Sequence, residues 1–453
     1  MPPTVEHVRL LGVGVGPANL SLACLIDGSR TPPGEQPLSC VFLEKRGSFG
    51  WHDGQQLPDA ALQVSMLKDL VSLADPSNPY SFLNYLHSQG RIYHFLNARF
   101  DAVPRQEFRN YLAWAAHRNP HIRFGHQVQS VDFNDTTNRF EVSTDRGLFT
   151  ADNISVAVGQ QPWTPPAAQP YLADADVFHV CEHTQRARDL AGRRVAVIGG
   201  GQSGAEAFLD LISRPAEQLP RRVTWVSRRA NFFPIDDTPF TNDYYMPDHS
   251  DYFASLSPAQ RQTFNSTHLL TSDGISESTL KAIYQRIYTH HYIHDRTDLV
   301  ALYPNRDLTT ITATADSPGY TLTATHNQHP DHTETTEHDT LILATGYRPH
   351  PLEFLRPLHD RLTPTTSTDG TVEYQIDHHY AAALSTPPGY NLYLQNATRG
   401  QRGLPDPNLS LLAWRAQRIH DQLTNTHTDP QHPSFIEWTT KQPATADGVL
   451  DER

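Results

Sequence analysis

At 453 residues, the chain is too long for one compact core, and its size predicts two or three domains. Its formal charge of −13, from 36 basic against 49 acidic residues, argues against nucleic acid as a partner. No apolar run reaches the roughly 20 residues of a membrane span, which argues against a membrane protein.

The N-terminal sequence and the cysteine and histidine content narrow the class further. The first residues lack the basic region and cleavage site of a signal peptide, which favours a cytoplasmic protein. Cys24, Cys40 and Cys181 are widely spaced and form no C-x-x-C pair, which argues against a disulfide scaffold and a dithiol redox centre. The 25 histidines show no ligand spacing, so we predict no metal site.

The first predicted unit, His7–Ile26, is a short apolar run that passes through clustered glycines into a helical pattern. A strand-like run follows at Cys40–Leu43 and ends at Glu44, where a carboxylate can accept hydrogen bonds from a ribose. Glycines in such a turn allow close approach of a pyrophosphate, which the N-terminus of the next helix then binds. The alternative is an ordinary tight turn. The pattern predicts an FAD site, with these candidate cofactor-binding residues: Gly12, Gly14, Gly16, Pro17, Asn19 (in place of the usual third glycine) and Glu44.

The second unit, Arg193–Ile212, has the same design and a complete G-x-G-x-x-G pattern. The strand after it, Val223–Val226, ends not in an acid but near two arginines. Arginines at this position suit the 2′-phosphate of NADPH, although a solvated basic pair is the alternative. The candidate NADPH-binding residues are Gly199, Gly201, Gln202, Ser203, Gly204, Arg228 and Arg229.

The rest of the chain frames these two units. Strand-like runs at Val156–Gly159 and Leu341–Tyr347 predict the crossings between domains. Arg228–Tyr284 reads as a mostly helical insertion, and Pro304–His338 as a meander of short strands. The predicted fold is α/β, with two Rossmann-like dinucleotide-binding domains and a smaller, mostly helical substrate domain.

We predict the following boundaries. An FAD-binding domain spans 5–185 and is completed by 345–424. An NADPH-binding domain spans 186–344 and contains an inserted helical substrate-binding segment at 232–290. A loosely ordered tail spans 425–453. Two dinucleotides without redox cysteines or a metal cluster predict a flavin that takes hydride from NADPH and passes electrons to a substrate or to oxygen.

The segment Trp51–Trp114 closely resembles the bacterial lysine and the fungal and bacterial ornithine N-hydroxylases of siderophore pathways. The resemblance continues in order through GGGQSGAE (199–206), DDTPFTNDYYMP (236–247), TSDGIS (271–276), ATGYRP (344–349) and LSLLAWRAQRI (409–419). It therefore covers nearly the whole chain. Baeyer–Villiger and sulfur-oxidising flavoproteins share the two nucleotide units but not Trp51–Trp114.

The resemblance implies hydroxylation of L-lysine to N6-hydroxy-L-lysine with NADPH and O2, through a flavin C4a-hydroperoxide, for a siderophore or another natural product. It also implies a homo-oligomer, a tetramer or a dimer. L-Ornithine and the diamines cadaverine and putrescine are the alternative substrates. Ornithine enzymes usually carry an Asn-Tyr pair where this chain has Asp273-Gly274, which favours lysine. A non-enzymatic flavin-binding redox sensor is the remaining alternative.

The resemblance also assigns residues. It places Gln63 beside the flavin ring, Gln202 beside the nicotinamide and Ser410 near substrate and flavin, with Gln63 and Ser410 as the catalytic candidates. It places Lys68 at the substrate carboxylate, where a diamine would offer no partner, and Asn242 at the backbone end of the amino acid. Without the resemblance, Lys68, Asn242 and Ser410 read as a surface lysine, a helix cap and a polar core residue. The remaining cofactor candidates are Trp51, His52, Thr345, Gly346, Tyr347 and Leu409.

Overall fold

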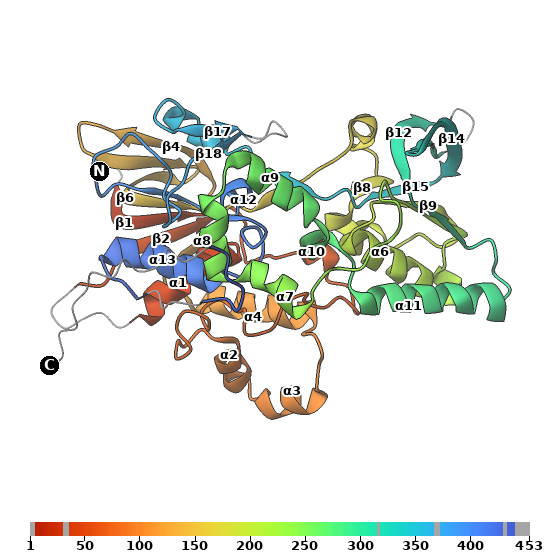
Figure 1. The fold of residues 1–453 in the computed structure, drawn as a ribbon, viewed down its shortest axis with the longest axis horizontal. Coiled ribbons are helices and arrows are strands. Elements are labelled where there is room, and N and C mark those ends of the chain that lie inside the picture. The colour runs from red at the N-terminus through yellow and green to blue at the C-terminus, as the bar shows by residue number, and fades with distance from the viewer. Residues whose placement is uncertain (1–4, 30–35, 315–317, 367–371, 429–432, 440–453) are drawn as a thin grey trace.

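The computed structural model describes residues 5–29, 36–314, 318–366, 372–428 and 433–439, which form two large sheets and three smaller ones, with helices between and around them (Figure 1). The first sheet has the strand order β3-β2-β1-β6-β5-β4, and β19 also pairs with β6. Its central strands are parallel, and β4 and β5 are antiparallel additions. The bounds are β1 Glu6–Val13, β2 Cys40–Glu44, β3 Ile122–Phe124, β4 Val128–Asn134, β5 Arg139–Thr144, β6 Gly147–Val156 and β19 Leu392–Leu394.

Both faces of the first sheet are covered, which explains why β1 has an apolar run rather than an alternating pattern. Leu10 packs into a core formed with helices α1 (Pro17–Gly28), α4 (Arg105–Arg118) and α13 (Leu412–Thr424). Leu11 packs on the opposite side, into a core with β4, β5 and the 3-10 helix η7 (Glu353–Leu358). Because β19 and α13 belong to this domain, the chain returns to its first sheet after building the second.

The second sheet is parallel, with the order β11-β10-β9-β15-β8. One face packs on α6 and α11, and the other packs on an antiparallel three-stranded sheet over the predicted meander. Its strands are β8 Val177–His179, β9 Arg194–Ile198, β10 Arg222–Val226, β11 Val300–Tyr303 and β15 Thr340–Leu343; the helices are α6 Gln202–Ser213 and α11 Glu277–Tyr288; the three-stranded sheet is β12 Arg306–Ala313, β13 Tyr320–His326 and β14 His329–His338.

The expected domain boundary at residue 186 is wrong. Strand β8 pairs with β15, so the chain has entered the second sheet by Val177. The crossing itself is an antiparallel pair of β7 (Gln160–Pro162) and β16 (Tyr347–Pro349). A three-residue strand carries too little periodicity to be recognised from sequence, because two alternations are not distinguishable from a loop.

The helical insertion lies between the two sheets (Figure 1). It contains α7 (Pro239–Asn242), η5 (Asp243–Tyr245), α8 (Pro247–Ser255), α9 (Pro258–Thr267) and α10 (Leu270–Asp273). The expected insertion, 232–290, also included α11, and this part of the expectation is wrong. Ile283 of α11 belongs to the buried core of the second sheet, so α11 is part of that domain.

The remaining elements are short. Helices α2 (Phe82–Ser88) and α3 (Ile92–Ala98) project from the first domain, and α2 begins at the N-cap Ser81. The hairpin of β17 (Pro364–Thr366) and β18 (Val372–Tyr374) and the short helix α12 (Arg399–Arg402) follow the crossing. The other short helices are η1 Asp53–Gln55, η2 Pro166–Tyr171, η3 Val180–Glu182, α5 His183–Arg186, η4 Ala216–Gln218 and the π-helix η6 Thr289–Ile293.

Some residues of the tail that was expected to be loosely ordered contact the rest of the protein. Thr428 donates to Asp421 of α13, and the Ser434 hydroxyl donates to Asp243 at 2.7 Å. The Trp438 ring contacts His249 of α8 at 4.6 Å between centroids. These three contacts hold Thr428, Ser434 and Trp438 against the folded domains, although residues 425–428 and Phe435 are exposed. Residues 429–432 and 440–453 lie outside the described residues. Across the part of the chain that is described, no helix is long and apolar enough to cross a membrane.

Candidate active site

The glycines of the first turn differ in what an added side chain would meet. Gly14 has φ +84°, and a Cβ there would lie 2.8 Å from the Ala157 carbonyl oxygen. A Cβ on Gly12 would overlap the Phe42 ring, so Gly12 serves packing. Gly16 meets only one atom within 4 Å, and it is the N-cap of α1, which no side chain caps. An uncapped helix start beside open space fits a pyrophosphate.

Asn19 supports this turn from behind. Its side chain is fully buried and its amide donates to the carbonyl oxygens of Val13, Gly14 and Ser155. Its Oδ1 accepts hydrogen bonds from Ser155 and Gln395. All the hydrogen-bonding groups of this side chain are therefore used within the protein, so only the backbone of Asn19 stays a predicted cofactor contact.

The other first-domain candidates surround the same turn. The Glu44 carboxylate accepts the backbone N–H of Val15 at 3.0 Å, which ties the end of β2 to the turn. His52 keeps an exposed surface, although many protein atoms lie around its ring. Its backbone is left-handed (φ 49°). Burial among these neighbours, with the nearby charge of Arg105, lowers the pKa of His52 to about 4. His52 is therefore a neutral imidazole at neutral pH, and its ring meets Trp51 edge-on at 4.7 Å.

The second glycine turn follows the expected division of labour among its three glycines. Gly199 has φ +134°, and Gly204 would place a Cβ 2.2 Å from the Gly199 carbonyl oxygen, so α6 packs closely on β9. Gly201 is the uncapped start of α6 and meets only the Asp273 carbonyl oxygen, at 3.6 Å. Ser203 follows in the first turn of α6, so both turns have the geometry of an anion cradle.

The two candidate arginines differ in their contacts. Arg228 has an exposed side chain at the end of β10. The Arg229 guanidinium donates to the carbonyl oxygens of Gly200 at 3.1 Å and Asp273 at 2.7 Å. Arg229 therefore joins the second glycine turn to the helical insertion, while Arg228 is the arginine that faces water.

Gln63 and Gln202, expected at the two redox rings, meet across the domains. Gln63 Nε2 donates to Gln202 Oε1 at 3.4 Å. The same Gln202 oxygen accepts the backbone N–H of Ser276, and its Nε2 donates to Glu206 and to Thr279. The side-chain amide of Gln202 thus forms hydrogen bonds with residues of both sheet domains and with the segment that precedes α11.

Lys68 and Ser410, 342 positions apart in the sequence, lie together. Lys68 Nζ donates to the Ser410 hydroxyl at 3.2 Å, and burial lowers the pKa of Lys68. The ammonium also lies 5.7 Å from the ring centroid of Tyr245, whose hydroxyl donates to the Thr271 carbonyl at 2.7 Å. Lys68 has no carboxylate within ion-pair distance in the described ranges. Its ammonium is therefore available to an anionic group.

Asn242 is exposed, and its amide donates to the Asp237 carbonyl at 2.8 Å. It lies one helical turn before Tyr245, so both are on the same side of the α7–η5 segment. No contact among the described residues joins Asn242 to Lys68 or Ser410, so its substrate role stays a prediction.

Sequence reasoning missed Tyr245 and Arg399. The Arg399 guanidinium donates to the Ser272 hydroxyl at 3.3 Å, and that hydroxyl donates to the Asp273 carboxylate at 2.8 Å. Arg399 has no acidic ion-pair partner in the part of the chain that is described. The motif TSDGIS drew attention to 271–276, but nothing in the sequence connects Arg399 to it, because the contact spans 127 positions.

The crossing between the domains contains the other candidates. The Thr345 hydroxyl donates to the Trp163 carbonyl oxygen, and Gly346 has φ +89° with open space beside it. The Tyr347 hydroxyl donates to Gln55 Oε1 at 3.0 Å. Leu409 packs, half-buried, against the first core beside Ser410. Their cofactor contacts stay predictions.

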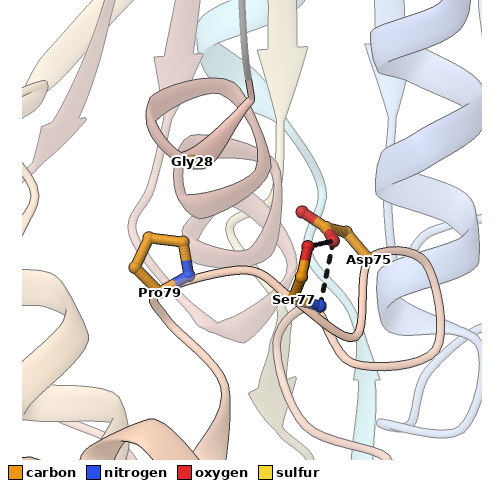
Figure 2. Close-up of a pocket in the computed structure, with 4 residues that line it drawn as sticks. All are labelled: Gly28, Asp75, Ser77 and Pro79. Carbon is orange, nitrogen blue, oxygen red and sulfur yellow. Dashed lines mark hydrogen bonds between the residues drawn. The ribbon is translucent and has the colours of Figure 1, made fainter.

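Two further features lie away from this site. A cavity of about 500 Å³ is lined by Gly28, Asp75, Ser77 and Pro79. The Asp75 carboxylate accepts hydrogen bonds from the backbone N–H and from the hydroxyl of Ser77 (Figure 2). The cavity lies at the C-terminal end of α1, opposite the glycine turn, so it does not belong to the active site. Asp377, His378 and His379 could approach a metal ion, but they are consecutive, and one Asp377 oxygen already accepts two backbone N–H groups.

Two uncapped glycine turns, on separate sheets with a helical segment between them, define an oxidoreductase fold that binds two dinucleotides. The family model described as L-lysine 6-monooxygenase/L-ornithine 5-monooxygenase matches residues 6–349. The chain belongs to this family. This result confirms the resemblance found in the sequence and the expected fold class.

Individual relatives differ in substrate. The chain is 36% identical to the L-lysine N6-monooxygenase of Escherichia coli, over 96% of this chain and 99% of that protein. It is 27% identical to an FAD-bound cadaverine monooxygenase of desferrioxamine biosynthesis from Erwinia amylovora, with a TM-score of 0.85 over 98% and 100% of the two chains. A Kutzneria ornithine N-hydroxylase, solved with reduced FAD, NADP+ and L-ornithine, is 28% identical, with a TM-score of 0.82 over 93% and 99%.

Proposed function

We propose that this enzyme hydroxylates the side-chain amine of L-lysine, using FAD, NADPH and O2. The observation that carries the proposal is Lys68, which is half-buried beside Ser410 and Tyr245 without an acidic partner among the described residues. A desolvated ammonium of this kind is stabilised by a carboxylate, which an amino acid supplies and a diamine does not.

Arg399 and Asp273 support an amino-acid substrate. The backbone end of an amino acid carries one carboxylate and one ammonium. Arg399 offers a guanidinium close to the Tyr245 segment, and Asp273 offers a carboxylate that accepts one side-chain hydrogen bond, from Ser272. Two cations, Lys68 and Arg399, and two carboxylates, Asp273 and Asp236, surround Tyr245, so groups of both signs are present to complement such a zwitterion.

The two uncapped turns support one cradle for each cofactor. The first turn with Glu44 would hold FAD, and the second turn with Arg228 would hold NADPH. When bound, FAD reduced by NADPH would activate O2, and O2 supplies the oxygen atom that is transferred to the amine. The residues of this chain hold the amino acid by its backbone end, so that its neutral side-chain amine faces the flavin and bulk water is excluded.

The cadaverine and ornithine relatives make a diamine and L-ornithine the competing substrates. The product of the proposed reaction, N6-hydroxy-L-lysine, would enter a siderophore or another N-hydroxylated natural product.

The substitution Lys68→Ala tests the substrate assignment. Removing one partner of a desolvated charge pair costs about 2–5 kcal/mol, which is at least a tenfold rise in KM for lysine. Turnover of cadaverine should change little, and FAD content and flavin reduction by NADPH should stay at the wild-type level. Hydroxylamine formation is measured for lysine, ornithine and cadaverine, because uncoupled NADPH oxidation would mask the loss.

Lys281→Ala is the matched control, since Lys281 is exposed on α11 and should leave all three substrates unaffected. If Lys68→Ala lowers cadaverine and lysine turnover equally, Lys68 acts on flavin or fold, and the amino-acid assignment loses its support.

A further inference from the structure

A buried ion pair joins the two sheet domains next to the expected redox rings. Arg105 of α4 donates to both carboxylate oxygens of Glu206 of α6, at 2.8 and 2.7 Å. The two side chains are 13% and 6% exposed. Arg105 also donates to the Gln55 carbonyl oxygen at 3.0 Å, so it is fixed within its own domain. A bidentate pair in this geometry sets both distance and direction between the two helices.

Glu206 also determines how the Gln202 amide is oriented. Glu206 Oε1 accepts Gln202 Nε2 at 2.9 Å. Because a carboxylate only accepts hydrogen bonds, it selects the NH2 end of the amide. The amide oxygen then faces the Ser276 N–H at 2.8 Å and Gln63 Nε2 at 3.4 Å. One amide orientation thus satisfies contacts from both sheet domains and from the residue preceding α11.

We propose that Arg105 and Glu206 are positioning residues for hydride transfer from NADPH to FAD. They act through Gln202 and Gln63, and they hold the second glycine turn at a fixed distance from the first. The inference rests on the proposed function, because Gln63 and Gln202 are the residues that the family resemblance places beside the flavin and the nicotinamide. Neither Arg105 nor Glu206 needs to touch a cofactor.

An ion pair suits this task better than apolar packing. Apolar contacts between domains tolerate sliding, whereas a fork of two hydrogen bonds fixes the direction of the contact. The pair also couples the position of Arg105 in the first domain to the orientation of the Gln202 amide in the second. A loss of the pair should therefore appear in the rate of hydride transfer before it appears in the affinity for NADPH.

The substitution Glu206→Gln removes the charge and keeps the size. We expect the anaerobic rate of flavin reduction at saturating NADPH to fall tenfold or more, while the Kd for NADP+ changes less than threefold. The matched control is Glu107→Gln, which breaks the bidentate pair of Glu107 with Arg91, on the same helix α4 but within one domain. This control should stay within twofold of wild type in both measurements.

A double-mutant cycle separates positioning from general stabilisation. Gln202→Leu should slow flavin reduction, and adding Glu206→Gln should slow it by less than the product of the two single effects, because Glu206 acts in part through the Gln202 amide. Arg105→Lys keeps the positive charge and should restore part of the rate that Arg105→Gln loses. If Glu206→Gln does not retain FAD, the flavin reduction rates of Arg105→Lys and Arg105→Gln are compared instead, and they test the positioning role in the same way.

Wild-type reduction rates in Glu206→Gln, or in Arg105→Gln with FAD retained, overturn the inference. Strictly additive effects of Gln202→Leu and Glu206→Gln also overturn it. Flavin reduction is measured without an amine substrate, so this result is independent of the substrate. A wild-type enzyme that reduces its flavin normally but forms no hydroxylamine from lysine would contradict the proposed substrate and leave the positioning role intact.

Discussion

Arg228 and Arg229 are neighbours in the sequence and have different tasks in the structure. The guanidinium of Arg229 is committed to two backbone carbonyl oxygens, one of them in the helical insertion. Burial lowers the pKa of Arg229, because the charged guanidinium loses contact with water at this position. Arg228 keeps its side chain in water at the end of β10, where a 2′-phosphate would lie.

Single substitutions should therefore separate the two arginines. Arg228→Ala removes a charge-assisted contact worth about 1.5–3 kcal/mol, so the preference for NADPH over NADH should fall roughly tenfold or more. Arg229→Ala should lower kcat/KM for both nucleotides alike, because it loosens the turn itself. The measurement is kcat/KM with each nucleotide. A preference that falls in Arg229→Ala and is unchanged in Arg228→Ala would reverse the assignment.

Single residues could be predicted from the sequence where their role depends on neighbouring positions. Residues whose role depends on distant parts of the chain could be predicted only through the family resemblance. Several glycines of the two turns were recognisable because positive φ at Gly14 and Gly199 and close approach at Gly204 restrict those positions to glycine. The pairing of Lys68 with Ser410 could not be predicted from spacing, because the two are 342 positions apart. The sequence could not show that the buried Asn19 side chain bonds to the turn and to β6, and the backbone of Asn19 stays a predicted cofactor contact.

Among the elements, α6 shows how two glycines on one helix can serve different purposes. Gly204 allows the helix to touch the Gly199 carbonyl, which sets the distance between α6 and β9. Gly201 meets nothing closer than 3.6 Å, and its φ of −104° is open to any residue. The protein therefore does not require glycine at 201, although a ligand at the start of α6 would.

Alanine at each position should give opposite results. Gly204→Ala forces overlap between helix and strand and should destabilise the protein by about 1–3 kcal/mol, which thermal unfolding would detect. Gly201→Ala should leave the melting temperature unchanged and weaken binding of NADP+, measured by calorimetry. Normal NADP+ affinity in Gly201→Ala would show that the phosphates do not approach this glycine.

Whole elements were predicted well where they were long. The two glycine-turn units and the three-stranded meander matched the structure, because their periodicity extends over many residues. The domain boundary failed at β8, which has three residues, and at α11, whose apolar face suited either domain. Tertiary packing, not local sequence, decides such cases.

At the scale of the whole molecule, the C-terminal segment closes over the helical insertion. Trp438 covers the fully buried His249, which also packs against Phe253 and Phe264. Burial lowers the pKa of His249 to about 4, with the neighbouring His268 adding to the shift and Asp243 opposing it. The imidazole is therefore neutral in the folded protein and titrates near its ordinary pKa when the chain unfolds.

This arrangement predicts acid sensitivity. A histidine whose pKa is lowered by folding contributes stability that is fully present above about pH 6.5 and is lost as the pH falls towards 4, since the unfolded chain takes up the proton first. His249→Phe should reduce the loss of unfolding free energy between these values by roughly 1–3 kcal/mol. Denaturant unfolding at a series of pH values measures this. The exposed His94→Phe is the control, and an equal pH dependence in both variants would contradict the prediction.

The return of β19 to the first sheet has a consequence for the order in which the two domains fold during synthesis. The second sheet has all its strands once Leu343 has left the ribosome, whereas the first sheet still lacks Leu392–Leu394 and the helix that covers α1. Domains that fold during synthesis do so as their last strand emerges. The first sheet should therefore be completed after the second, and the flavin should be acquired only once β19 and α13 (Leu412–Thr424) have been synthesised. A nascent chain arrested after residue 343 would have a formed second domain beside an unfinished first one.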